Sequence, residues 1–560
     1  MIFRTGPHSH TRWSRGARGL SAAALVGALV LSGCATGKNP MAGPADLTVA
    51  VSSLPTIMDW EVGLQYTNEN FTVTAQTQAN LLRHPYVEDP ENPDMAVMDF
   101  TSYEPVLLDQ ETPYEIDGNT YTFHLKEGVL SQQGNPLTTE DVIYSLERKF
   151  AYNSPGLPSL VPYFTSMDQV TAVDDHTFTV DFHHTDAGNI FLDFLGGMNG
   201  RIYDKEALDE HATEDDPYAL EWTSTVQANE GWGFGPYTIG SITPDQQMVL
   251  EANENYALGE PDVKSVVFQV APESGTRTVL LGSGSVDIAE ALTPTDLSSL
   301  SGSDEVKLAS VMSPIEFSNL VLTQNKEPFD NELVRQAFRY AVPYDRIIEE
   351  VYKGLAVESY GWLSTQVQGL DMDPAYTYDP ENAKELLAEA GMESVEFTLN
   401  VPNSIPDLVD SAILIQSEAR KAGFEVNVRQ ASAGDIATGR AEQEFQGLLV
   451  SNRSQIQKPI YAYRTFFNPE NPSNNNGAFT PPAEWEDLIG SANTAGEPFS
   501  AEAAEYWNQL QEITYQDASN LPMVYKQPNQ AFRKGISNVS YRFDNTIDYS
   551  ILELEDDDRE

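Results

Sequence analysis

Three motifs in the sequence contain residue types that do chemistry in other proteins, but none has the required spacing. Residues 231–237 (GWGFGPY) are rich in glycine, yet Pro236 has no N–H for a phosphate and no G-x-x-x-x-G-K pattern follows. Residues 282–285 (GSGS) lack the G-x-S-x-G spacing of a nucleophilic serine. His183 and His184 suggest a metal, but neighbours on a strand point to opposite faces and no H-E-x-x-H motif is present. The sequence therefore predicts no catalytic residue, no metal site and no cofactor.

The composition excludes one class of partner and limits the redox chemistry. The 560 residues include 84 acidic and 32 basic side chains, which gives a formal net charge of −52. Nucleic acid is therefore not an expected partner, because contacts with phosphates need a basic surface. Hydrophobic residues make up 41% of the chain, as in ordinary globular proteins, and the length predicts two or three domains. The single cysteine, Cys34, allows no disulfide within the chain.

The first 33 residues have the pattern of a secretory signal peptide. They contain four arginines and no acid, and the apolar run at residues 20–31 is shorter than the about 20 residues that span a bilayer. Residues 31–34 (LSGC) resemble the lipobox of bacterial lipoproteins, which implies cleavage before Cys34 and a diacylglycerol on its thiol. Residues 34–45 are then a flexible tether. The alternative is a signal peptide without lipidation.

A strand, a turn and a capped helix are predicted early in the chain. Tyr121, Phe123 and Leu125 alternate with polar residues, which is the pattern of a half-buried strand. After a Gly-Asn-Pro turn, Thr138 or Thr139 can cap a helix that has two acidic residues in its first turn. Such a unit is more often scaffold than binding site.

Periodicity predicts further elements along the chain. Residues 170–182 alternate on both sides of Asp174-Asp175-His176, so they predict a hairpin. Other strands are predicted at residues 46–52, 396–401 and 424–428, and helices are predicted to end at residues 80–85, to be capped by Asp345 and to cover 413–421. The helix at 413–421 lies between two predicted strands, which indicates an α/β crossover. Arg335 is predicted to form a structural ion pair, with contact to a ligand as the alternative.

The strand–turn–helix segment resembles a signature of the bacterial extracellular solute-binding proteins of family 5. Residues 121–148 read YTFHLKEGVLSQQGNPLTTEDVIYSLER, and they depart from the family pattern at Ser131 and Gln133, where Phe and Asp are usual. Residues 278–289 and 325–354 are similar to further segments of the same family.

The resemblance implies a fold and a domain organisation. It implies an α/β protein with a two-lobed periplasmic-binding-protein-like fold of the large three-domain type (class II, cluster C-like), whose lobes close on a ligand by hinge motion. The predicted domains are a discontinuous domain I at 46–80, 231–307 and 522–560, domain II at 81–230, and domain III at 308–521. Residues 521–525 (LPMVY) resemble the strand that returns to domain I in this family, so the resemblance implies a strand there.

Residues 448–459 (LLVSNRSQIQKP) differ from similar peptide binders in a way that concerns the ligand. Those proteins have a Trp, then an Asp that can neutralise a peptide amino terminus, then an acid before a Pro. Asn452, Gln455 and Lys458 take these places, and Arg453 adds positive charge. A buried ammonium without a partner is disfavoured by several (~3–5) kcal/mol, which favours an anionic, blocked or neutral ligand. The alternative is that the partner acid comes from elsewhere in the chain.

Three large aromatic residues lie in segments that face the ligand cleft in similar proteins. Trp232, Phe234 and Trp362 are therefore predicted ligand contacts, with core packing as the alternative for each.

The resemblance implies a function in transport. We predict the solute-binding subunit of an ABC importer, lipid-anchored at the extracytoplasmic face of the cell membrane, on the cell surface or in the periplasm. It would capture a peptide or peptide-sized solute between its lobes and deliver it to the permease. We expect a monomer that is not an enzyme. The alternatives are a binder of a non-peptide or anionic small solute, a receptor-like or chaperone protein of the same fold, and a secreted hydrolase, which would need paired carboxylates or a nucleophile with a base.

Overall fold

The computed structural model describes residues 46–555 except 56, 63–67, 90–91, 153, 155–156, 158–163, 184–186, 226–229, 310–315, 360, 364–365, 372–376, 455, 470–476, 529 and 543–545. The predicted signal peptide, Cys34, the whole predicted tether and His184 lie outside the described residues. In the described ranges, no helix combines the length and the apolar character needed to cross a bilayer.

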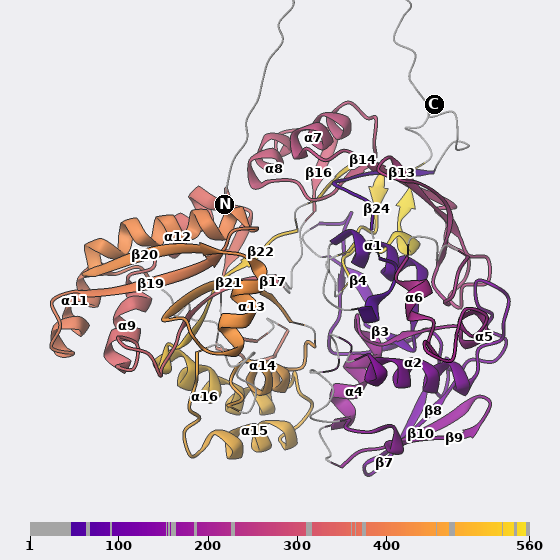
Figure 1. The fold of residues 1–560 in the computed structure, drawn as a ribbon, viewed down its shortest axis with the longest axis horizontal. Helices are drawn as coiled ribbons and strands as arrows, with labels where there is room; N and C mark the ends of the chain where they lie inside the picture. The colour runs from indigo at the N-terminus through magenta and orange to yellow at the C-terminus, as the bar shows by residue number, and fades with distance from the viewer. Residues whose placement is uncertain are drawn as a thin grey trace, which may run out of the picture. The chain divides into compact units, whose positions relative to one another are not determined.

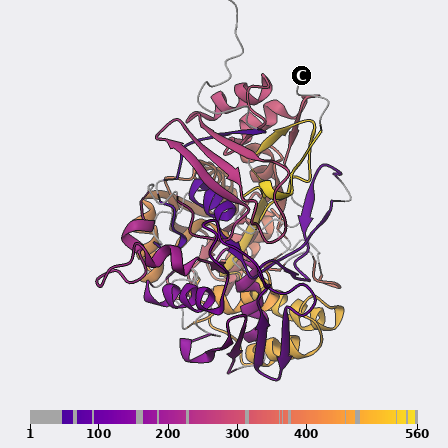
Figure 2. The ribbon, with the colours of Figure 1, turned by 90° about the vertical axis from the view of Figure 1, so that its right-hand side faces the viewer.

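A seven-stranded sheet collects strands from the start, the middle and the end of the described chain. Its order is β12-β13-β14-β1-β15-β23-β16, with β1 parallel to β14 and β15 and the other neighbours antiparallel. The strands are β1 (Leu47–Val51), β12 (Tyr237–Thr243), β13 (Gln247–Ala252), β14 (Ser265–Val270), β15 (Ile288–Ala289), β16 (Val306–Leu308) and β23 (Ala531–Arg533). Leu47, Val49 and Phe268 are buried in one apolar core of this sheet. The yellow C-terminal segment lies beside magenta strands in both views (Figures 1 and 2).

A four-stranded antiparallel sheet, β7-β8-β10-β9, contains the strand predicted near residue 121. Its strands are β7 (Tyr114–Asp117), β8 (Thr120–His124), β9 (Val170–Asp174) and β10 (Thr177–Asp181), and β9 with β10 forms the predicted hairpin. Phe123 and Phe178 stack across β8 and β10 with ring centroids 4.9 Å apart. Helix α2 (Thr139–Ala151) begins after Thr138, whose backbone N–H donates to Asp141 Oδ2 at 2.7 Å. The predicted cap is therefore confirmed.

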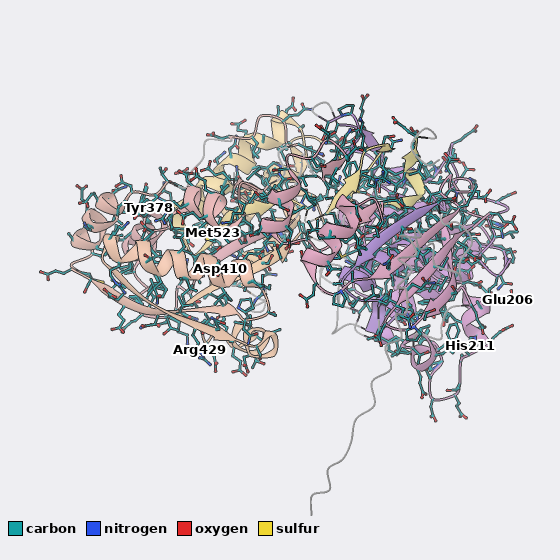
Figure 3. The ribbon with its side chains drawn as sticks, turned by 90° about the horizontal axis from the view of Figure 1, so that it is seen from above. Glu206, His211, Tyr378, Asp410, Arg429 and Met523 are labelled. Carbon is teal, nitrogen blue, oxygen red and sulfur yellow. The ribbon has the colours of Figure 1, made fainter. Side chains whose placement is uncertain are left out.

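A six-stranded sheet has the order β18-β22-β17-β21-β19-β20. Its strands are β17 (Glu316–Leu322), β18 (Ala356–Glu358), β19 (Val395–Pro402), β20 (Phe424–Ala431), β21 (Gly447–Arg453) and β22 (Asn520–Lys526). Strands β19 and β20 are parallel and α12 (Pro406–Ala419) connects them, as the predicted crossover requires. Met523 is buried in the core of this sheet, whereas Asp410 of α12 and Arg429 of β20 are exposed (Figure 3).

The remaining elements flank these sheets. Before residue 309 they are η1 (Trp60–Val62), α1 (Asn68–Thr77), β2 (Ala79–Asn80), β3 (Leu82–Arg83), β4 (Tyr86–Glu88), β5 (Ala96–Met98), β6 (Glu104–Pro105), η2 (Met167–Gln169), α4 (Ala187–Gly196), β11 (Arg201–Ile202), α5 (Lys205–Asp209), α6 (Leu220–Thr223), α7 (Ser274–Gly282) and α8 (Pro294–Leu300). After it they are α9 (Glu332–Tyr340), α10 (Tyr344–Arg346), η3 (Ile347–Val351), α11 (Pro380–Glu389), η4 (Arg420–Ala422), α13 (Ala433–Ala441), α14 (Pro459–Phe466), α15 (Trp485–Thr494), α16 (Ala501–Asp517), β24 (Ile536–Ser537), η5 (Tyr549–Ile551) and β25 (Glu553–Leu554).

The chain crosses twice between the seven-stranded and the six-stranded sheet. One crossing runs from β16 to β17 and the other from β22 to β23. We use "first lobe" for the described residues of 46–309 and 527–555, and "second lobe" for those of 316–526. The strand predicted at 521–525 is present as β22, but it pairs with β17 and β18 and so lies in the second lobe.

Two local predictions differ from the structure and one agrees. Helix α1 ends at Thr77, and residues 80–85 contribute to the short strands β2 and β3 because their backbones pair with β11 and β6. Asp345 lies inside α10, which begins after Pro343. Arg335 does form the predicted ion pair, with its NH2 group 3.1 Å from Asp517 Oδ1.

Candidate functional site

A buried acidic residue of the first lobe faces a buried basic residue of the second lobe. Asp193 is on α4, in the almost wholly apolar segment IFLDFLG. Because this segment packs in the core, the carboxylate of Asp193 is buried as well. Lys458 directly precedes α14 and is 6% exposed. Asp193 Oδ1 lies 3.7 Å from Lys458 Nζ, and Asp193 Oδ2 accepts a hydrogen bond of 3.0 Å from the backbone N–H of Gln457. Since 3.7 Å exceeds a hydrogen-bond distance, the two charges attract without being bonded.

Two further side chains of the first lobe contact Asp193. Tyr103 donates its hydroxyl hydrogen to Asp193 Oδ1, and burial, followed by the charge of Asp193, raises the pKa of Tyr103 well above its ordinary value. His84 donates from Nδ1 to the carbonyl of Ser102 at 2.9 Å, and its Nε2 lies 3.6 Å from Asp193 Oδ1. We call Asp193, Lys458, Tyr103 and His84 the interlobe polar cluster.

The imidazole of His84 is neutral at pH 7. Burial lowers its pKa below the ordinary 6.5, and the charge of Lys458 lowers it further, which together outweigh the attraction of Asp193. At 3.6 Å, the His84–Asp193 contact is therefore not a salt bridge at pH 7.

Replacing His84 with glutamine is expected to flatten the dependence of stability on acid. Because the pKa of His84 is lower in the folded chain than in the unfolded chain, the unfolded chain binds this proton more readily below pH 6.5, and the free energy of unfolding of the native protein falls as the pH falls. His84→Gln removes this loss. Denaturant titrations at about pH 7 and about pH 5 measure it, with the exposed His183→Gln as the control. An equal loss in the native protein and in His84→Gln would contradict the assignment.

Trp362 of the second lobe lies in the same apolar core as Leu81 and Leu195 of the first lobe. The ring of Trp362 lies 5.6 Å from that of Phe317, 4.9 Å from that of Phe466 and 5.1 Å from that of Phe467. The indole Nε1 of Trp362 is buried, and no described residue accepts its hydrogen bond. A ligand carbonyl or carboxylate at this point would satisfy that donor.

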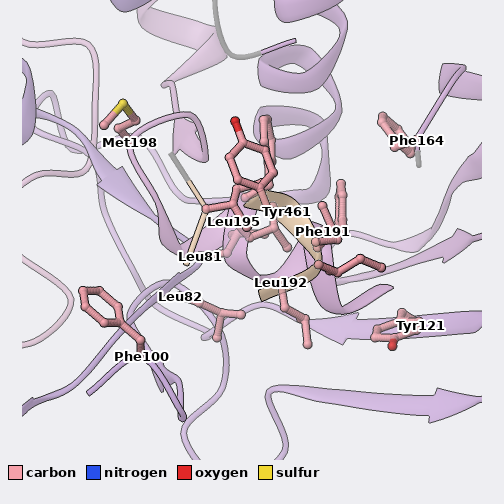
Figure 4. Close-up of a cluster of buried hydrophobic side chains, with 14 of the residues drawn as sticks. Leu81, Leu82, Phe100, Tyr121, Phe164, Phe191, Leu192, Leu195, Met198 and Tyr461 are labelled. Carbon is pink, nitrogen blue, oxygen red and sulfur yellow. The ribbon is translucent and has the colours of Figure 1, made fainter. Parts of the chain in front are cut away.

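Apolar and polar contacts both join the lobes near the cluster. Tyr461 of α14 belongs to one buried apolar cluster with Leu81 and Leu195 of the first lobe (Figure 4). Gln366 of the second lobe accepts a hydrogen bond from the N–H of Phe100 and donates one to the carbonyl of Met98, each 2.9 Å long. The side chain of Gln366 thus acts as a two-point link between the lobes.

The structure brings together only some of the predicted ligand contacts. Lys458 belongs to the interlobe polar cluster, and Phe234 and Trp362 share one apolar cluster. Trp232 lies in a different core, 3% exposed, with its ring 5.2 Å from that of Tyr203. The ligand role of these four residues stays a prediction.

The strand that precedes Lys458 carries two of the other predicted contacts. Asn452 is half-buried, and its Nδ2 donates to Asn319 Oδ1 within the second lobe. Arg453 is placed by the backbone pairing of β21 with Glu316 of β17. Gln455 lies outside the described residues.

Asp193, Tyr103 and Gln366 were not predicted from the sequence. Asp193 had a readable signal, a single carboxylate inside an apolar helix, because such a charge is rarely buried without a purpose. Tyr103 and Gln366 had none, since their partners are far away in the sequence. The described residues hold no group of three or more His, Cys, Asp or Glu side chains that could bind a metal ion. The arrangement offers charged and polar anchors between two lobes, which is a geometry for binding.

Comparison with known proteins identifies the family. A profile of the bacterial extracellular solute-binding proteins, family 5 (middle region), matches residues 102–474, about two thirds of the chain. Heme-binding protein A of Haemophilus influenzae is 28% identical over 448 residues, which cover 76% of this chain and 79% of that protein. The dipeptide-binding protein of Escherichia coli is 26% identical over 452 residues, covering 75% and 80%.

Solved structures share the fold. HbpA2 from Haemophilus parasuis superposes with a TM-score of 0.74 at 21% identity, covering 91% of this chain and 99% of that one. The periplasmic binding protein DppA from Helicobacter pylori, in complex with the peptide STSA, gives 0.71 at 22% identity, covering 91% and 98%. The fold is the two-lobed, mixed α/β fold of periplasmic binding proteins. The chain belongs to the bacterial extracellular solute-binding proteins of family 5.

Proposed function

We propose that this protein is the solute-binding subunit of an ABC importer and that it captures a peptide or peptide-sized solute between its two lobes. The observation that carries the proposal is the contact of Asp193 with Lys458, where buried groups of opposite charge from the two lobes lie 3.7 Å apart. Binding sites of this kind enclose a ligand away from water and orient it with a few polar groups. Membership of the family supports the role in transport.

The charges of the cluster favour a solute that carries both an ammonium and a carboxylate. Asp193 can receive the ammonium of a peptide, which Gln455 cannot do, and Lys458 can pair with a carboxylate. The acid that residues 448–459 lack would then come from α4. The relative named as a dipeptide-binding protein and the structure bound to a peptide support this choice. A purely anionic or blocked solute is the second candidate, favoured by the positive charges of Arg453 and Lys458.

The lobes would close on the solute by rotating about the two crossings between the sheets. Domains I and II would form the first lobe and domain III the second. The pairing of β22 with β17 supports placing the return to domain I after Lys526, so that domain III covers residues 308–526. The other boundaries stay as predicted from the sequence. Delivery to the permease would follow when the lobes reopen.

A lipid on Cys34 would hold the protein, as a monomer, at the outer face of the cell membrane. Cys34→Ala is expected to move the protein from the membrane fraction to the soluble fraction, because stable anchoring needs more than one acyl chain or an equivalent signal. Fractionation of cells followed by immunoblotting measures this, with Thr36→Ala in the predicted tether as the control. A membrane-bound Cys34→Ala protein would contradict the anchor.

The experiment that tests the proposed function is native mass spectrometry of the full chain in detergent, followed by denaturing release of the bound solute. Peptides with free amino termini are the expected result. Release of a single anionic or blocked molecule would favour the second candidate, an anionic or blocked solute, over a solute that carries both an ammonium and a carboxylate. Conversion of added peptide to products would contradict a binding role and support a hydrolase. A protein that neither carries a solute nor is stabilised by any added peptide would contradict the proposal.

A further inference from the structure

Three asparagines form a ladder of hydrogen bonds across the six-stranded sheet of the second lobe. Asn452, Asn319 and Asn520 lie on the neighbouring strands β21, β17 and β22. Asn452 Nδ2 donates to Asn319 Oδ1, and Asn319 Nδ2 donates to Asn520 Oδ1 at 2.5 Å. Asn319 and Asn520 are at most 1% exposed, whereas Asn452 is half-buried. Of the three residues, Asn452 is therefore the one that a solute can reach.

Apolar side chains lie on both sides of the asparagine ladder. Phe317, Asn319 and Val321 alternate along β17 and so lie on one face of the sheet. Phe317 belongs to the apolar core that contains residues of both lobes, and Val321 packs with Leu448 and Val450 in a separate cluster. A buried polar group without a partner is strongly disfavoured, so the hydrogen bonds of the ladder decide how each amide is oriented.

The ladder fixes which atom of Asn452 faces outward. A side-chain amide has one carbonyl oxygen and one amino group. The amino group of Asn319 bonds to Asn520, so its oxygen is left for Asn452, which turns its own amino group toward it. Asn452 Oδ1 therefore points away from Asn319, and no described residue donates to it. Hydrogen bonds in a chain polarise one another, which makes this oxygen a stronger acceptor.

Asn452 belongs to the part of the second lobe that meets the first lobe. Its partner across the strand pair is Phe317, whose ring lies 5.6 Å from that of Trp362. The indole Nε1 of Trp362 is a buried donor that has no acceptor among the described residues. Further along the segment that follows Asn452, Gln457 donates its backbone N–H to Asp193 of the first lobe. An acceptor at Asn452 and a donor at Trp362 thus flank Phe317.

We propose that Asn452 accepts a hydrogen bond from an amide N–H of the solute, and that Asn319 and Asn520 are positioning residues that hold it in this orientation. The carbonyl oxygen of the solute amide would bond to Trp362 Nε1. The inference rests on the proposed function, because it names an internal group of a peptide that the second lobe recognises. The interlobe polar cluster would hold the charged ends, and the ladder would select an amide over an ester between them.

Titration calorimetry of the full chain in detergent tests the inference, with dialanine and alanyl-lactate as probes. Alanyl-lactate has an ester oxygen in place of the amide N–H, with the same length and the same charged ends. The native protein is expected to bind dialanine about fivefold more tightly than alanyl-lactate, because the ester lacks one hydrogen-bond donor. Asn452→Ala is expected to abolish this preference, because it removes the acceptor.

The positioning role is tested by combining Asn319→Leu with Asn520→Leu. Replacing both partners by apolar groups of similar size should change the free energy of unfolding little, since it also removes Asn520 Nδ2, which is buried and has no acceptor among the described residues. The preference for dialanine should nevertheless disappear, because nothing then orients the amide of Asn452. Asn427→Leu is the matched control, since the exposed Asn427 donates to Glu396 at 3.0 Å between β20 and β19.

Equal affinity of the native protein for the two probes would overturn the inference and leave the proposed function in place. A preference that survives Asn452→Ala would do the same, and one that survives the double variant would overturn the positioning role. Should the double variant fail to fold, Asn520→Leu alone frees Asn319 to turn over, and an unchanged preference would again contradict that role. No binding of dialanine would also overturn the inference, whereas peptides released in the mass-spectrometry experiment would still support the proposed function.

Discussion

Replacing Arg148 with methionine is expected to lower the free energy of unfolding by about 3–5 kcal/mol, the usual effect of removing one partner from a buried ion pair. Arg148 is fully buried on α2. One of its NH nitrogens donates to Asp59 Oδ1 at 2.9 Å, and the other contacts Asp59 Oδ2. Methionine keeps most of the apolar stem but leaves the carboxylate of Asp59 in the interior without its cation.

The pair matters because it ties distant parts of the first lobe together. Asp59 directly precedes η1, and Arg148 lies near the end of α2. The next residue of the helix repeats the link, since Lys149 Nζ donates to Glu61 Oε1 at 2.7 Å. Thr223 of α6 adds a hydroxyl that donates to Asp59 Oδ2. Three segments are therefore fixed by one network of charges.

Denaturant titration at about pH 7 measures the effect. The control is Arg420→Met, because Arg420 is 63% exposed next to Glu425 and its removal is expected to change nothing measurable. Burial raises the pKa of Asp59, but the charge of Arg148 and the hydrogen bonds to the carboxylate lower it below 3.8. The ion pair therefore stabilises the fold above pH 3.8, and this contribution is lost as the pH falls further. The difference between the native protein and Arg148→Met should therefore shrink in acid. Equal stability at neutral pH would contradict the prediction.

Local features of the fold could be predicted from the sequence because they are encoded within a few residues. The cap at Thr138 depends on Asp141, three positions away, and the hairpin at β9 and β10 depends on a turn between two alternating runs. The end of α1 was missed for the opposite reason. Residues 80–85 look helical in isolation. In the structure Asn80 pairs with Arg201 of β11, and Leu82 and Arg83 pair with β6, so the partners lie far along the chain.

The site was less predictable because its contacts join remote segments. Gln457 and Asp193 are separated by 264 residues, and no short window contains both. The family resemblance predicted that Lys458 contacts the ligand, and in the structure Lys458 lies next to Asp193 of the first lobe. The same resemblance gave Trp232 a ligand role, which stays a prediction; in the structure its ring packs 5.2 Å from that of Tyr203 in a different core. Aromatic residues near a glycine-rich turn serve packing as readily as binding, and only the three-dimensional neighbours distinguish the two.

Replacing Asp193 with asparagine is expected to weaken binding of the transported solute about 30-fold or more, the lower end of the range for truncating a buried charge pair. Asparagine has nearly the same shape and can still accept the hydrogen bond from Gln457, so the change is one of charge. It removes the group that would receive an ammonium and leaves Lys458, which is 6% exposed, without its facing carboxylate. Titration calorimetry with the solute released in the mass-spectrometry experiment measures the loss. Asp168→Asn, on the exposed side of η2, is the control.

A double variant separates contact with the solute from mere closure of the lobes. If Asp193 and Lys458 only attract each other, Asp193→Asn combined with Lys458→Met should bind about as well as either single variant, because both changes break the same pair. If Asp193 holds the ammonium and Lys458 the carboxylate of one solute, the two losses should add. A peptide blocked at its amino terminus should then be insensitive to Asp193→Asn and still sensitive to Lys458→Met. Unchanged affinity in both single variants would show that neither Asp193 nor Lys458 contacts the solute. The solute would then bind away from this ion pair between the lobes.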